Sequence, residues 1–467
     1  MKGTTRREFI KSASAAAAAG AVPSILKAQQ APSLNVVGAN SRLNVACVGY
    51  SDRFCEALFP AFRNNMKSMN IDLVAVADLW RKRLYERARP EIEKALGHKV
   101  DAYASDEELY EKAKNVDAVI ISTADFQHAR HAVHAVEAGK DVYCEKPLAE
   151  DMASANLALD AVNAKRRAGY GPGAVLQIGS QRRSGLWYAA AKDWFSNPEF
   201  GELCYANLNY NVNQPRRWRR DEKLIASCRE EDVDWRKWLL DRPYVGFDAR
   251  KFLEFRLYWP YSSGIPGQWM CHAIDTISWY TGIPYPTSVM ASGGLYQWTD
   301  GRQSFDTFAA TFEYGTSGEK GKGFQVQFNS HMTNSDFAFQ DRYYSTRGCI
   351  DLAEGTFSNK GSDAEPVSKP LTSVREGWAP GEYHVGGDPM TTRHMRNWLE
   401  CVRDRKDPVA PIEAGYNHSV ALIMANASAR CGGRATFDAA SRQVIVNGKP
   451  FVGYESTELG FFDRFFS

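Results

Sequence analysis

The stretch "GKDVYCEKPLA", residues 139–149, decides the fold prediction. Its centre, "VYC", is typical of a short buried strand, because β-branched and aromatic residues fill the inner positions of a sheet. Pro147 cannot donate to a strand ladder, so the strand is expected to end before it. Glu145 and Lys146 then lie at the carboxyl end of a strand, where open α/β sheets bind ligands. Taken alone, a solvated Glu-Lys pair before a turn is the simpler interpretation.

Strands and helices alternate on both sides of this stretch. Apolar, strand-like runs end at Gly49, at Asp78 and near Thr123, and a helical run follows each of them. This alternation predicts a parallel sheet with helices on its faces. We therefore expect the α/β fold class, with a first domain of this kind at residues 43–168.

The sequence after residue 172 has a different rhythm. Alternating runs, such as "AVLQIGS" (174–180), "LCYANLNYNV" (203–212) and several between 286 and 352, lie close together and are joined by Gly-rich turns. Such strands favour antiparallel pairing. We expect an α+β domain at residues 169–440 with one large, mostly antiparallel sheet, followed by a C-terminal strand and tail at 441–467.

The amino-terminal residues are typical of an export signal. The twin arginine Arg6-Arg7, with Phe9 two positions on, precedes an Ala-rich stretch that is too short and too weakly apolar to span a membrane. An ordinary amino-terminal helix is the alternative. The pattern predicts a twin-arginine signal peptide at 1–28, a linker at 29–42, and a periplasmic or otherwise exported protein. Nothing else approaches a transmembrane run.

The composition is that of an ordinary globular protein. Of the 467 residues, 44% are hydrophobic and 24% are charged, and the formal net charge of +2 argues against a nucleic-acid partner. The nine cysteines are scattered without a spacing typical of zinc, so no metal is expected. The cluster "PRRWRR" at 215–220 is either a solvated loop or a holder of an anionic or polyhydroxylated ligand.

A strand, a glycine, a helix and an acidic residue after the next strand outline a dinucleotide site. In "GYSDRF", residues 49–54, only the first glycine of the usual GxGxxG pattern is present, and Phe54 is expected to press the helix away from the strand. Asp78 ends the second strand, where a carboxylate binds the hydroxyls of an adenosine ribose or caps a helix. Its charge favours NAD over NADP, although Arg81 could pair with a 2′-phosphate.

The third main strand is also followed by polar residues at its carboxyl end, in "STADFQHARH", residues 122–131. His128 lies at the start of the next helix and is the better candidate for a site. His128 and His131 lie three apart and share one helix face. Because no acidic partner is visible, we expect no metal pair there and a surface position for His131 or His134.

The run "ISTADFQHARHAVHAVEAGKDVYCEKPLAEDM", residues 121–152, resembles the Gfo/Idh/MocA oxidoreductase family, whose members carry T-P-D-x-x-H followed by A-G-K-x-V-x-x-E-K-P. Ala124 replaces the usual Pro. Similar segments, among them "LQIGSQRRSGLWY" (176–188) and "GQWMCHAIDTISWYTG" (267–282), extend the resemblance over about residues 43–440. The resemblance implies a Rossmann domain plus an open-faced α/β domain, a nicotinamide cofactor between them, sugar-like or cyclitol substrates, and a homodimer or homotetramer.

The resemblance also implies a catalytic group: the Lys of E-K-P, with an Asp and a His spaced D-x-x-x-H. Lys146 and His272 match, but Gln268 stands where the Asp is expected. Gln268 shares a helix face with His272 and can orient a hydroxyl, yet its amide cannot take a proton at neutral pH. We therefore expect His272 to be the base and Lys146 the electrostatic anchor. Asp275 either orients the imidazole or packs with a backbone amide.

Together, the patterns and the resemblance define the expected site. Catalytic contacts are expected from Lys146, His272 and Gln268; cofactor contacts from Gly49, Tyr50, Ser51, Asp78, Ser122, Thr123, Asp125, His128, Glu145, Lys146 and Gln181; and substrate contacts from Arg183, Trp218, Trp259, Tyr261 and Asp275. The leading function is an exported, NAD(H)-dependent oxidoreductase that transfers hydride between a tightly bound nicotinamide and a secondary hydroxyl or keto group of a sugar, sugar derivative or cyclitol. A redox-neutral glycosidase or lyase that oxidises a sugar ring transiently is the second interpretation. A non-catalytic sugar- or nucleotide-binding protein is the third.

Overall fold

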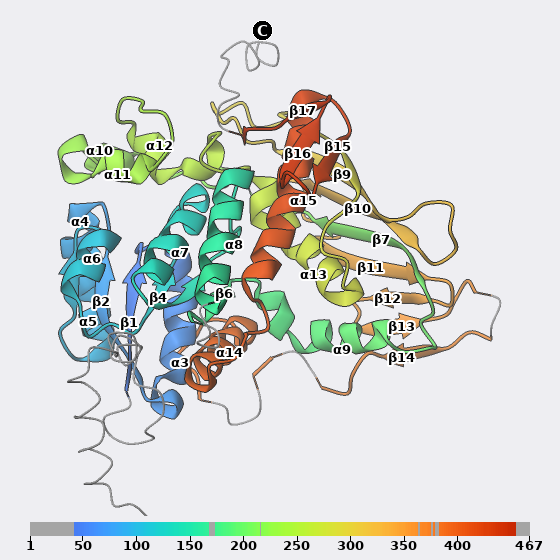
Figure 1. Ribbon diagram of the computed structural model, residues 1–467, viewed down its shortest axis with the longest axis horizontal. Helices are drawn as coiled ribbons and strands as arrows, with labels where there is room; N and C mark the ends of the chain where they lie inside the picture. Colours follow the sequence, from blue (N-terminus) through green and yellow to red (C-terminus); the bar gives the residue numbers. More distant parts are fainter. Residues whose placement is uncertain are drawn as a thin grey trace, which may run out of the picture.

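The computed structural model describes residues 42–167, 173–214, 216–362, 365–374, 377–378 and 383–453. Two sheets lie side by side, with the long helix α15 (Ile412–Cys431) between them (Figure 1). The predicted signal peptide, residues 29–41 of the predicted linker and residues 454–467 of the predicted tail lie outside the described residues. No described helix is both long and apolar enough to cross a membrane.

The first sheet has six parallel strands in the order β3-β2-β1-β4-β5-β6, which is the strand order of a Rossmann domain. Every residue of β4 and β5 is buried, because helices cover both faces of the sheet. The strands are β1 (Leu43–Val48), β2 (Ile71–Ala77), β3 (Asp101–Tyr103), β4 (Ala118–Ile121), β5 (Asp141–Cys144) and β6 (Leu176–Ile178).

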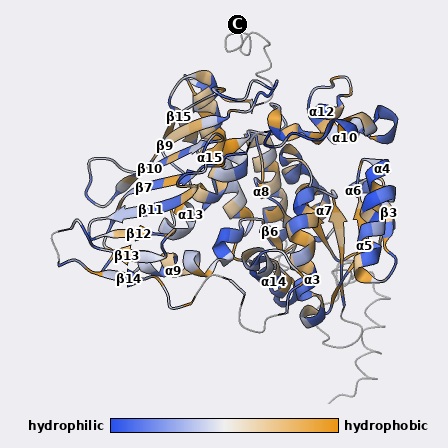
Figure 2. Cartoon of the chain, turned by 180° about the vertical axis from the view of Figure 1, so that it is seen from behind, coloured by the Kyte–Doolittle hydropathy of each residue, from blue (hydrophilic) through white to orange (hydrophobic). Residues whose placement is uncertain are grey.

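The helices of the first domain are hydrophilic on their outer surfaces, whereas the strands between them are hydrophobic (Figure 2). Helices α7 and α8 pack on one face of the sheet, and α3 packs on the other. The helices are α3 (Phe59–Met69), α4 (Arg81–Arg83), α5 (Arg89–Leu96), α6 (Asp106–Lys112), α7 (His128–Glu137) and α8 (Met152–Arg167).

Two segments that the sequence analysis assigned to the second domain belong with the first sheet. Strand β6, formed by part of "AVLQIGS", pairs in parallel with β5, so its predicted place as the first strand of the second domain is wrong. Helix α14 (Pro389–Asp404) packs on α3, and its Trp398 and Leu399 are fully buried in the core beneath the parallel sheet. Local periodicity identifies a strand or an amphipathic helix but not the sheet against which it packs.

The second sheet has eleven strands in the order β14-β13-β12-β11-β7-β10-β9-β8-β15-β16-β17. It is antiparallel as expected, except that β7 and β10 pair in parallel. Helices α9, α13 and α15 pack together and cover one face of it (Figure 1). An α/β Rossmann domain therefore joins a domain with a large, mostly antiparallel sheet, and the predicted fold class is confirmed. The elements are β7 (Leu203–Tyr210), β8 (Ser288–Gly294), β9 (Thr307–Gly315), β10 (Gly323–His331), β11 (Phe339–Ser345), β12 (Cys349–Asp351), β13 (Thr356–Ser358), β14 (Ser368–Pro370), β15 (Ala435–Asp438), β16 (Gln443–Val446), β17 (Lys449–Pro450), α9 (Leu186–Phe195) and α13 (Cys271–Thr281).

Residues 216–258 cross from the second domain over the rim of the first, and we name this segment the cap (Figure 1). It carries α10 (Glu222–Ser227), α11 (Trp235–Leu239) and α12 (Ala249–Leu253). Its aromatic side chains share a buried cluster with Trp80 and Phe126 of the first domain. Ion pairs also attach it to that domain, at Arg220–Asp52, Asp241–Arg130 and Arg242–Asp151. The cap is thus fixed by both apolar packing and charge.

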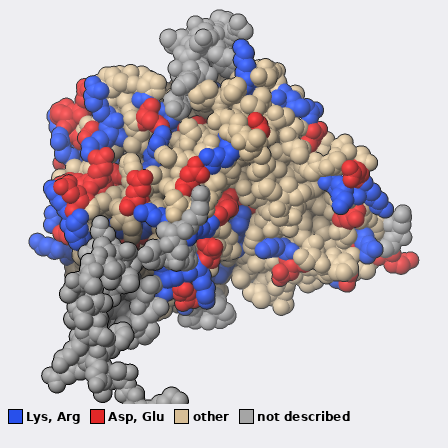
Figure 3. Space-filling view, viewed as in Figure 1, with Lys and Arg blue, Asp and Glu red and all other residues tan. Residues whose placement is uncertain are grey.

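Charged side chains are distributed unevenly over the face shown in Figure 3. Lys, Arg, Asp and Glu gather over the first domain, whereas uncharged residues cover most of the second. On this face the two signs are interspersed over the first domain, so its surface charge consists of mixed pairs rather than a single-sign patch.

Candidate active site

The larger of two adjoining cavities lies at the carboxyl ends of β1, β2 and β4 and has a volume of about 340 Å³. This is the edge at which parallel sheets bind ligands. Gly49 has a φ of +85°, and a Cβ atom on it would lie 2.7 Å from Cγ2 of Thr123, so the turn requires glycine. The cavity is lined by six residues predicted to contact a cofactor: Gly49, Tyr50, Ser51, Asp78, Ser122 and Thr123.

The residues that replace the other two glycines do not close this cavity. Ser51 lines it, and its Oγ accepts a hydrogen bond from N of Phe54 at 3.2 Å. The Phe54 ring is fully buried, stacks on Phe59 with centroids 5.5 Å apart, and is not among the lining residues. From the sequence, we expect the Phe54 ring to press the helix away from the strand. In the structure, the helix has a π-helical turn at this point, Phe54–Leu58.

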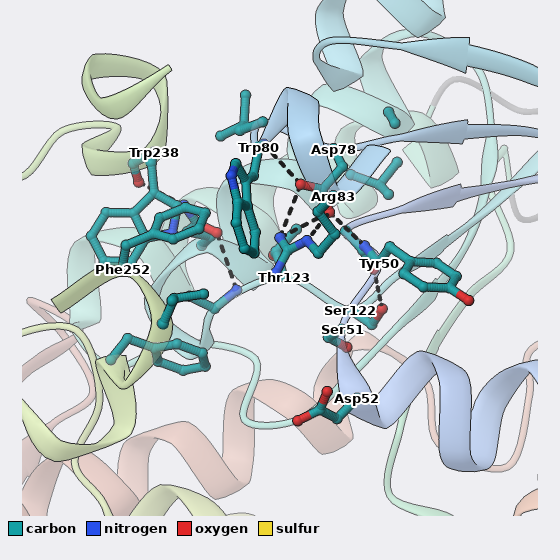
Figure 4. A pocket seen from close by; sticks show the side chains of 18 of the residues that line it. Tyr50, Ser51, Asp52, Asp78, Trp80, Arg83, Ser122, Thr123, Trp238 and Phe252 are labelled. Carbon is teal, nitrogen blue, oxygen red and sulfur yellow. Dashed lines mark hydrogen bonds and ion pairs between the residues drawn. The ribbon is translucent and has the colours of Figure 1, made fainter. Parts of the chain in front are cut away.

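Asp78 is saturated with hydrogen bonds (Figure 4). Its Oδ1 accepts from N of Trp80 and from Nη2 of Arg83, both at 2.9 Å. Its Oδ2 accepts from N of Tyr50 at 2.9 Å and from Nε of Arg83 at 3.0 Å. A carboxylate has about four acceptor positions, so in this arrangement Asp78 has none left for a ribose hydroxyl, contrary to the sequence-based expectation. Asp78 does not cap the next helix either, because the N-cap residue of α4 is Trp80 and no side chain caps this helix end.

Aromatic side chains of both domains enclose the far end of the larger cavity (Figure 4). Trp80 follows β2, whereas Trp238 and Phe252 come from the cap. Trp80 and Phe252 meet edge to face, with centroids 6.1 Å apart. The sequence does not predict this wall, because nothing in the spacing of the cap residues shows that they fold back over β2.

The smaller cavity has a volume of about 60 Å³ and lies at the tips of β4 and β5. His128, Glu145, Lys146 and Gln268, all predicted from sequence, line it. Nδ1 of His128 lies 2.7 Å from O of Pro147 and so holds the E-K-P loop. The two cavities adjoin, because they share the lining residues Ser51, Arg53, Ser122, Thr123 and Arg256.

The joined cavities suit a dinucleotide. The aromatic wall suits a base, and the polar turn at Gly49 and Ser51 suits phosphates. Oγ1 of Thr123, at the junction, is buried without a hydrogen-bond partner among the described residues. A bound nucleotide would supply that partner, since buried hydroxyls are normally hydrogen-bonded.

Lys146 and Glu145 are held in different ways at the tip of β5. Nζ of Lys146 donates to the backbone O of Gln268 at 2.8 Å, and this contact joins the two domains. Glu145 accepts from Nε of Arg53 at 2.8 Å. Burial opposes ionisation of Glu145, but the positive charges of Arg53 and Lys146 outweigh it and lower the pKa of this carboxyl below its usual value. Glu145 therefore remains a carboxylate that anchors Arg53.

Both ends of the Gln268 amide are occupied. Its Oε1 accepts from Nε of Arg256 at 2.9 Å, and its Nε2 donates to Oδ2 of Asp125 at 2.5 Å. Gln268 lines the smaller cavity as predicted, and these two bonds leave one N–H and one acceptor position of its amide for a ligand. Asp125, predicted as a cofactor contact, is buried behind Gln268 and also accepts from Oγ of Ser262 at 2.6 Å. Arg256, which the sequence does not single out, faces both cavities, as does Arg53.

His272 lies half-buried on α13, and its charge state is set by its surroundings. Burial, followed by the positive charges of Lys146, Arg182 and Arg53, lowers the pKa of His272 well below its usual value. Its Nδ1 is buried without a hydrogen-bond partner among the described residues. The imidazole is therefore neutral at neutral pH. His272 is not among the residues that line either cavity.

Arg183 and Asp275, both expected to touch substrate, form a buried ion pair with each other. Nε and Nη2 of Arg183 each donate to Asp275 at 2.8 Å, and Asp275 is fully buried. Neither lines the two cavities, and neither sequence-based interpretation of Asp275 holds. Asp275 lies 3.9 Å from Nδ1 of His418, whose Nε2 accepts from N of Leu148 at 3.2 Å. The pair thus supports the E-K-P loop from behind.

Replacing Arg183 by Met should lower the free energy of unfolding by about 3–5 kcal/mol, because it leaves the Asp275 carboxylate buried without its partner. Denaturant unfolding followed by circular dichroism measures this change. Arg442→Met is the matched control, since Arg442 pairs with Asp160 at the surface and should cost at most about 1 kcal/mol. Equal stability of the two variants would contradict the structural role of the Arg183 pair.

The predicted aromatic substrate wall does not form as a unit. Trp259 is buried beneath Arg430, whose guanidinium lies 4.0 Å from the ring centroid. Tyr261 is buried against Phe126 and Trp238. Only Trp218 is half-buried, and it packs on Trp269 with centroids 5.6 Å apart. Aromatic rings contribute most to cores, and that is where two of the three predicted residues lie.

Gln181 contacts the E-K-P region without lining either cavity. In the amide orientation that satisfies both neighbours, it donates to O of Gly179 at 2.5 Å and accepts from Nη2 of Arg53 at 3.3 Å. Gln181 therefore supports Arg53, so its predicted contact with the cofactor is at most indirect in this arrangement.

Of the two histidines considered for a surface position, His131 is buried and His134 is half-buried. Both histidines have an acidic partner that the sequence analysis did not see: Oδ2 of Asp106 lies 2.8 Å from Nδ1 of His131 and 2.9 Å from Nδ1 of His134. Asp106 raises the pKa of His134, so this imidazole binds the carboxylate more readily as a cation. Three such groups can ligate a metal ion. The adjacent cavity is of mixed charge, because Arg130 and Lys237 line it together with their partners Asp241 and Glu107.

Comparison with known proteins agrees with this geometry. Residues 43–170 match the model of the Gfo/Idh/MocA family, described as an oxidoreductase family with an NAD-binding Rossmann fold. Over 131 residues the chain is 28% identical to inositol 2-dehydrogenase of Gluconacetobacter diazotrophicus and 33% identical to inositol 2-dehydrogenase 2 of Saccharopolyspora erythraea. Each alignment covers 28% of this chain and 37% of the relative, so the chain matches less than two fifths of the relatives' length.

The likeness to solved structures extends over both domains. Levoglucosan dehydrogenase in complex with NADH has a TM-score of 0.59 at 16% identity, and an oxidoreductase domain protein from Kribbella flavida has 0.60 at 18% identity. Each covers 84% of this chain and 98% of its own. At these identities the likeness shows the shared fold. The chain thus has the two-domain fold of these structures. Its residues 43–170 match the model of the Gfo/Idh/MocA family, with an NAD-binding Rossmann fold.

Proposed function

We propose that this protein is an NAD(H)-dependent oxidoreductase that interconverts a secondary hydroxyl and a keto group of a sugar, sugar derivative or cyclitol. The observation that carries the proposal is the junction of the two cavities, where Lys146 reaches from the Rossmann domain to Gln268 of the second domain. The nicotinamide supplies the hydride acceptor or donor when it is bound. The residues of the chain bind the cofactor, orient the substrate and exchange its proton.

The larger cavity holds the nucleotide in this proposal. Gly49 and Ser51 let the backbone approach the phosphates, and the free hydroxyl of Thr123 meets the nucleotide near the junction. Trp80 and Phe252 enclose the base from opposite domains. Because rings of the cap form part of this wall, the nucleotide is retained between turnovers unless the cap moves.

Lys146 and His272 act on the substrate oxygen and its proton. The Lys146 ammonium stabilises the negative charge that develops on the oxygen as its proton leaves. The neutral imidazole of His272 accepts that proton, and in the reverse direction it returns the proton to the oxygen. Gln268 positions Lys146 through its backbone O, while its side chain is held by Arg256 and Asp125.

The substrate class is supported by the relatives. Two are named inositol 2-dehydrogenase, and one neighbour of similar fold is named levoglucosan dehydrogenase. These names favour a polyhydroxylated ring as substrate. The twin-arginine pattern at Arg6-Arg7 supports export, and a cofactor enclosed by the cap fits a compartment where free NAD is scarce.

Mass spectrometry of the small molecules released on denaturing the exported, full-length protein tests the proposal. We expect NAD or a close analogue in near-stoichiometric amount, and a change in the absorbance of the bound reduced nicotinamide when inositols or sugars are added. Protein without any nucleotide, and without affinity for added NADH, would contradict the proposed function.

The same preparation, incubated with aryl glycosides, tests the redox-neutral alternative. The replacement of the expected Asp by Gln268, whose amide cannot take a proton at neutral pH, is the observation that keeps this alternative open. Release of a phenol with no net change in bound NADH would favour a glycosidase over a dehydrogenase.

A further inference from the structure

Arg83 occupies the place in the larger cavity where a cofactor ribose would be recognised. It lies on α4, five residues after Asp78, and lines the cavity. Its guanidinium is bidentate on Asp78, as Figure 4 shows, and uses two of the four acceptor positions of that carboxylate. The other two are taken by backbone N–H groups of Tyr50 and Trp80. A ribose diol would therefore have to displace one of these donors to reach Asp78.

The Arg83 guanidinium is also fixed in position by aromatic rings. Its Cζ lies 5.4 Å from the centroid of Trp80 and 5.6 Å from that of Phe252, within the range of cation–π attraction. The side chain remains about a fifth exposed, at 22%. A guanidinium has five N–H donors, of which Asp78 takes two, so three remain for a ligand in the cavity.

The charges around Arg83 favour an anion. The guanidinium neutralises Asp78, which is otherwise the acidic group that repels a 2′-phosphate. Other charged residues also line the cavity: Asp52, Arg53, Lys82, Glu86, Arg87, Asp106, Arg220 and Arg256. Among the cations, Arg83 is the one that holds Asp78, and its fork of donors suits a phosphate beside that carboxylate.

We propose, on the basis of the proposed function, that Arg83 sets the cofactor specificity of this site. It shields Asp78 from the ribose diol of NAD(H) and offers its remaining N–H groups to the 2′-phosphate of NADP(H). The site therefore accepts NADP(H) as well as NAD(H), although its second strand ends in the aspartate that commonly excludes the phosphorylated cofactor.

Binding of NADH and NADPH to the full chain, freed of co-purified nucleotide, tests this inference. Trp80 and Trp238 line the cavity, so energy transfer from tryptophan to the reduced nicotinamide reports binding directly and without turnover. For the unaltered protein we expect dissociation constants within about tenfold of each other. Arg83→Ala should weaken NADPH at least about tenfold, as loss of a charge-assisted contact predicts, and leave NADH within about threefold or tighter.

Two further variants make the test specific. Arg81→Ala is the matched control, because Arg81 precedes Arg83 by two residues, contacts the backbone O of Glu231 and does not line the cavity; it should leave both affinities within about threefold. Arg83→Lys keeps the charge without the fork, and it should weaken NADPH less than Arg83→Ala does. If the alanine variant fails to fold, as judged by circular dichroism, the lysine variant carries the comparison.

The possible outcomes separate the inference from the function on which it rests. A preference for NADH of more than about tenfold in the unaltered protein, or an equal effect of Arg83→Ala on both nucleotides, would overturn the role of Arg83. Loss of NADPH binding in Arg81→Ala instead would assign the phosphate to that residue and also overturn it. Binding of neither nucleotide to the unaltered protein would refute the proposed function itself.

Discussion

Replacing Lys146 by Met should lower turnover about 10²–10³-fold while NADH still binds, because an ammonium aimed at a developing oxyanion stabilises the transition state more than the ground state. The structure holds this ammonium in place by its 2.8 Å contact with O of Gln268. The expected signature is a loss in kcat measured with an active polyol at saturating cofactor, with NADH affinity measured separately by tryptophan energy transfer.

Lys140→Met is the matched control for this prediction. Lys140 lies just before the same strand, β5, at the end opposite the cavities, and its Nζ donates to O of Val116 at 2.7 Å. Its replacement should leave kcat unchanged. If Lys146→Met retained more than about a fifth of the turnover, Lys146 would not stabilise the developing negative charge on the substrate oxygen.

Replacing His272 by Ala should lower turnover about 10²–10⁴-fold, the range typical of a lost general base. A loss of less than about threefold would reject the role of base. Ser278→Ala, on the same helix α13, is the control, because its Oγ is used in a hydrogen bond to O of Asp275 within the helix. The Ser278 variant should keep its turnover.

The pH profile of oxidation supplies an independent measurement on His272. Protonation removes the base, so the rate falls as the pH drops through the pKa of His272. Burial and the charge of Lys146 lower that pKa, so the acid limb should lie below the usual histidine value of about 6.5. In Lys146→Met the residual activity should show an acid limb shifted to higher pH, because a neighbouring positive charge is gone. An unshifted limb would show that the two side chains do not interact.

Much of the fold follows from local sequence. The buried strands β4 and β5 are predicted by β-branched and aromatic runs, and the tips of these strands are marked by polar residues and by Pro147. Because parallel strands carry their ligand sites at the carboxyl ends, the positions of Gly49, Thr123 and Lys146 at the cavities follow from the same argument.

The remaining features depend on pairings between distant residues. Arg183 pairs with Asp275, which lies 92 positions away in the sequence, and Asp106 contacts His131, which lies 25 positions away. No local sequence pattern specifies such partners. The saturation of Asp78 by Arg83 is a local pairing, yet the sequence shows only that a cation lies nearby and not where its fork points. The aromatic wall depends in addition on how the cap folds over β2.

Helix α14 determines when, during synthesis, the hydrophobic core under the first sheet can be completed. Its Trp398 and Leu399 complete the apolar layer under β1 and β2, although more than three hundred positions separate them from those strands. A nascent chain that has not yet reached residue 389 would expose that layer to water, which invites aggregation. The core under the first sheet is therefore complete only after α14 has been synthesised, and a nucleotide that needs this complete core can be taken up only by a chain that includes α14.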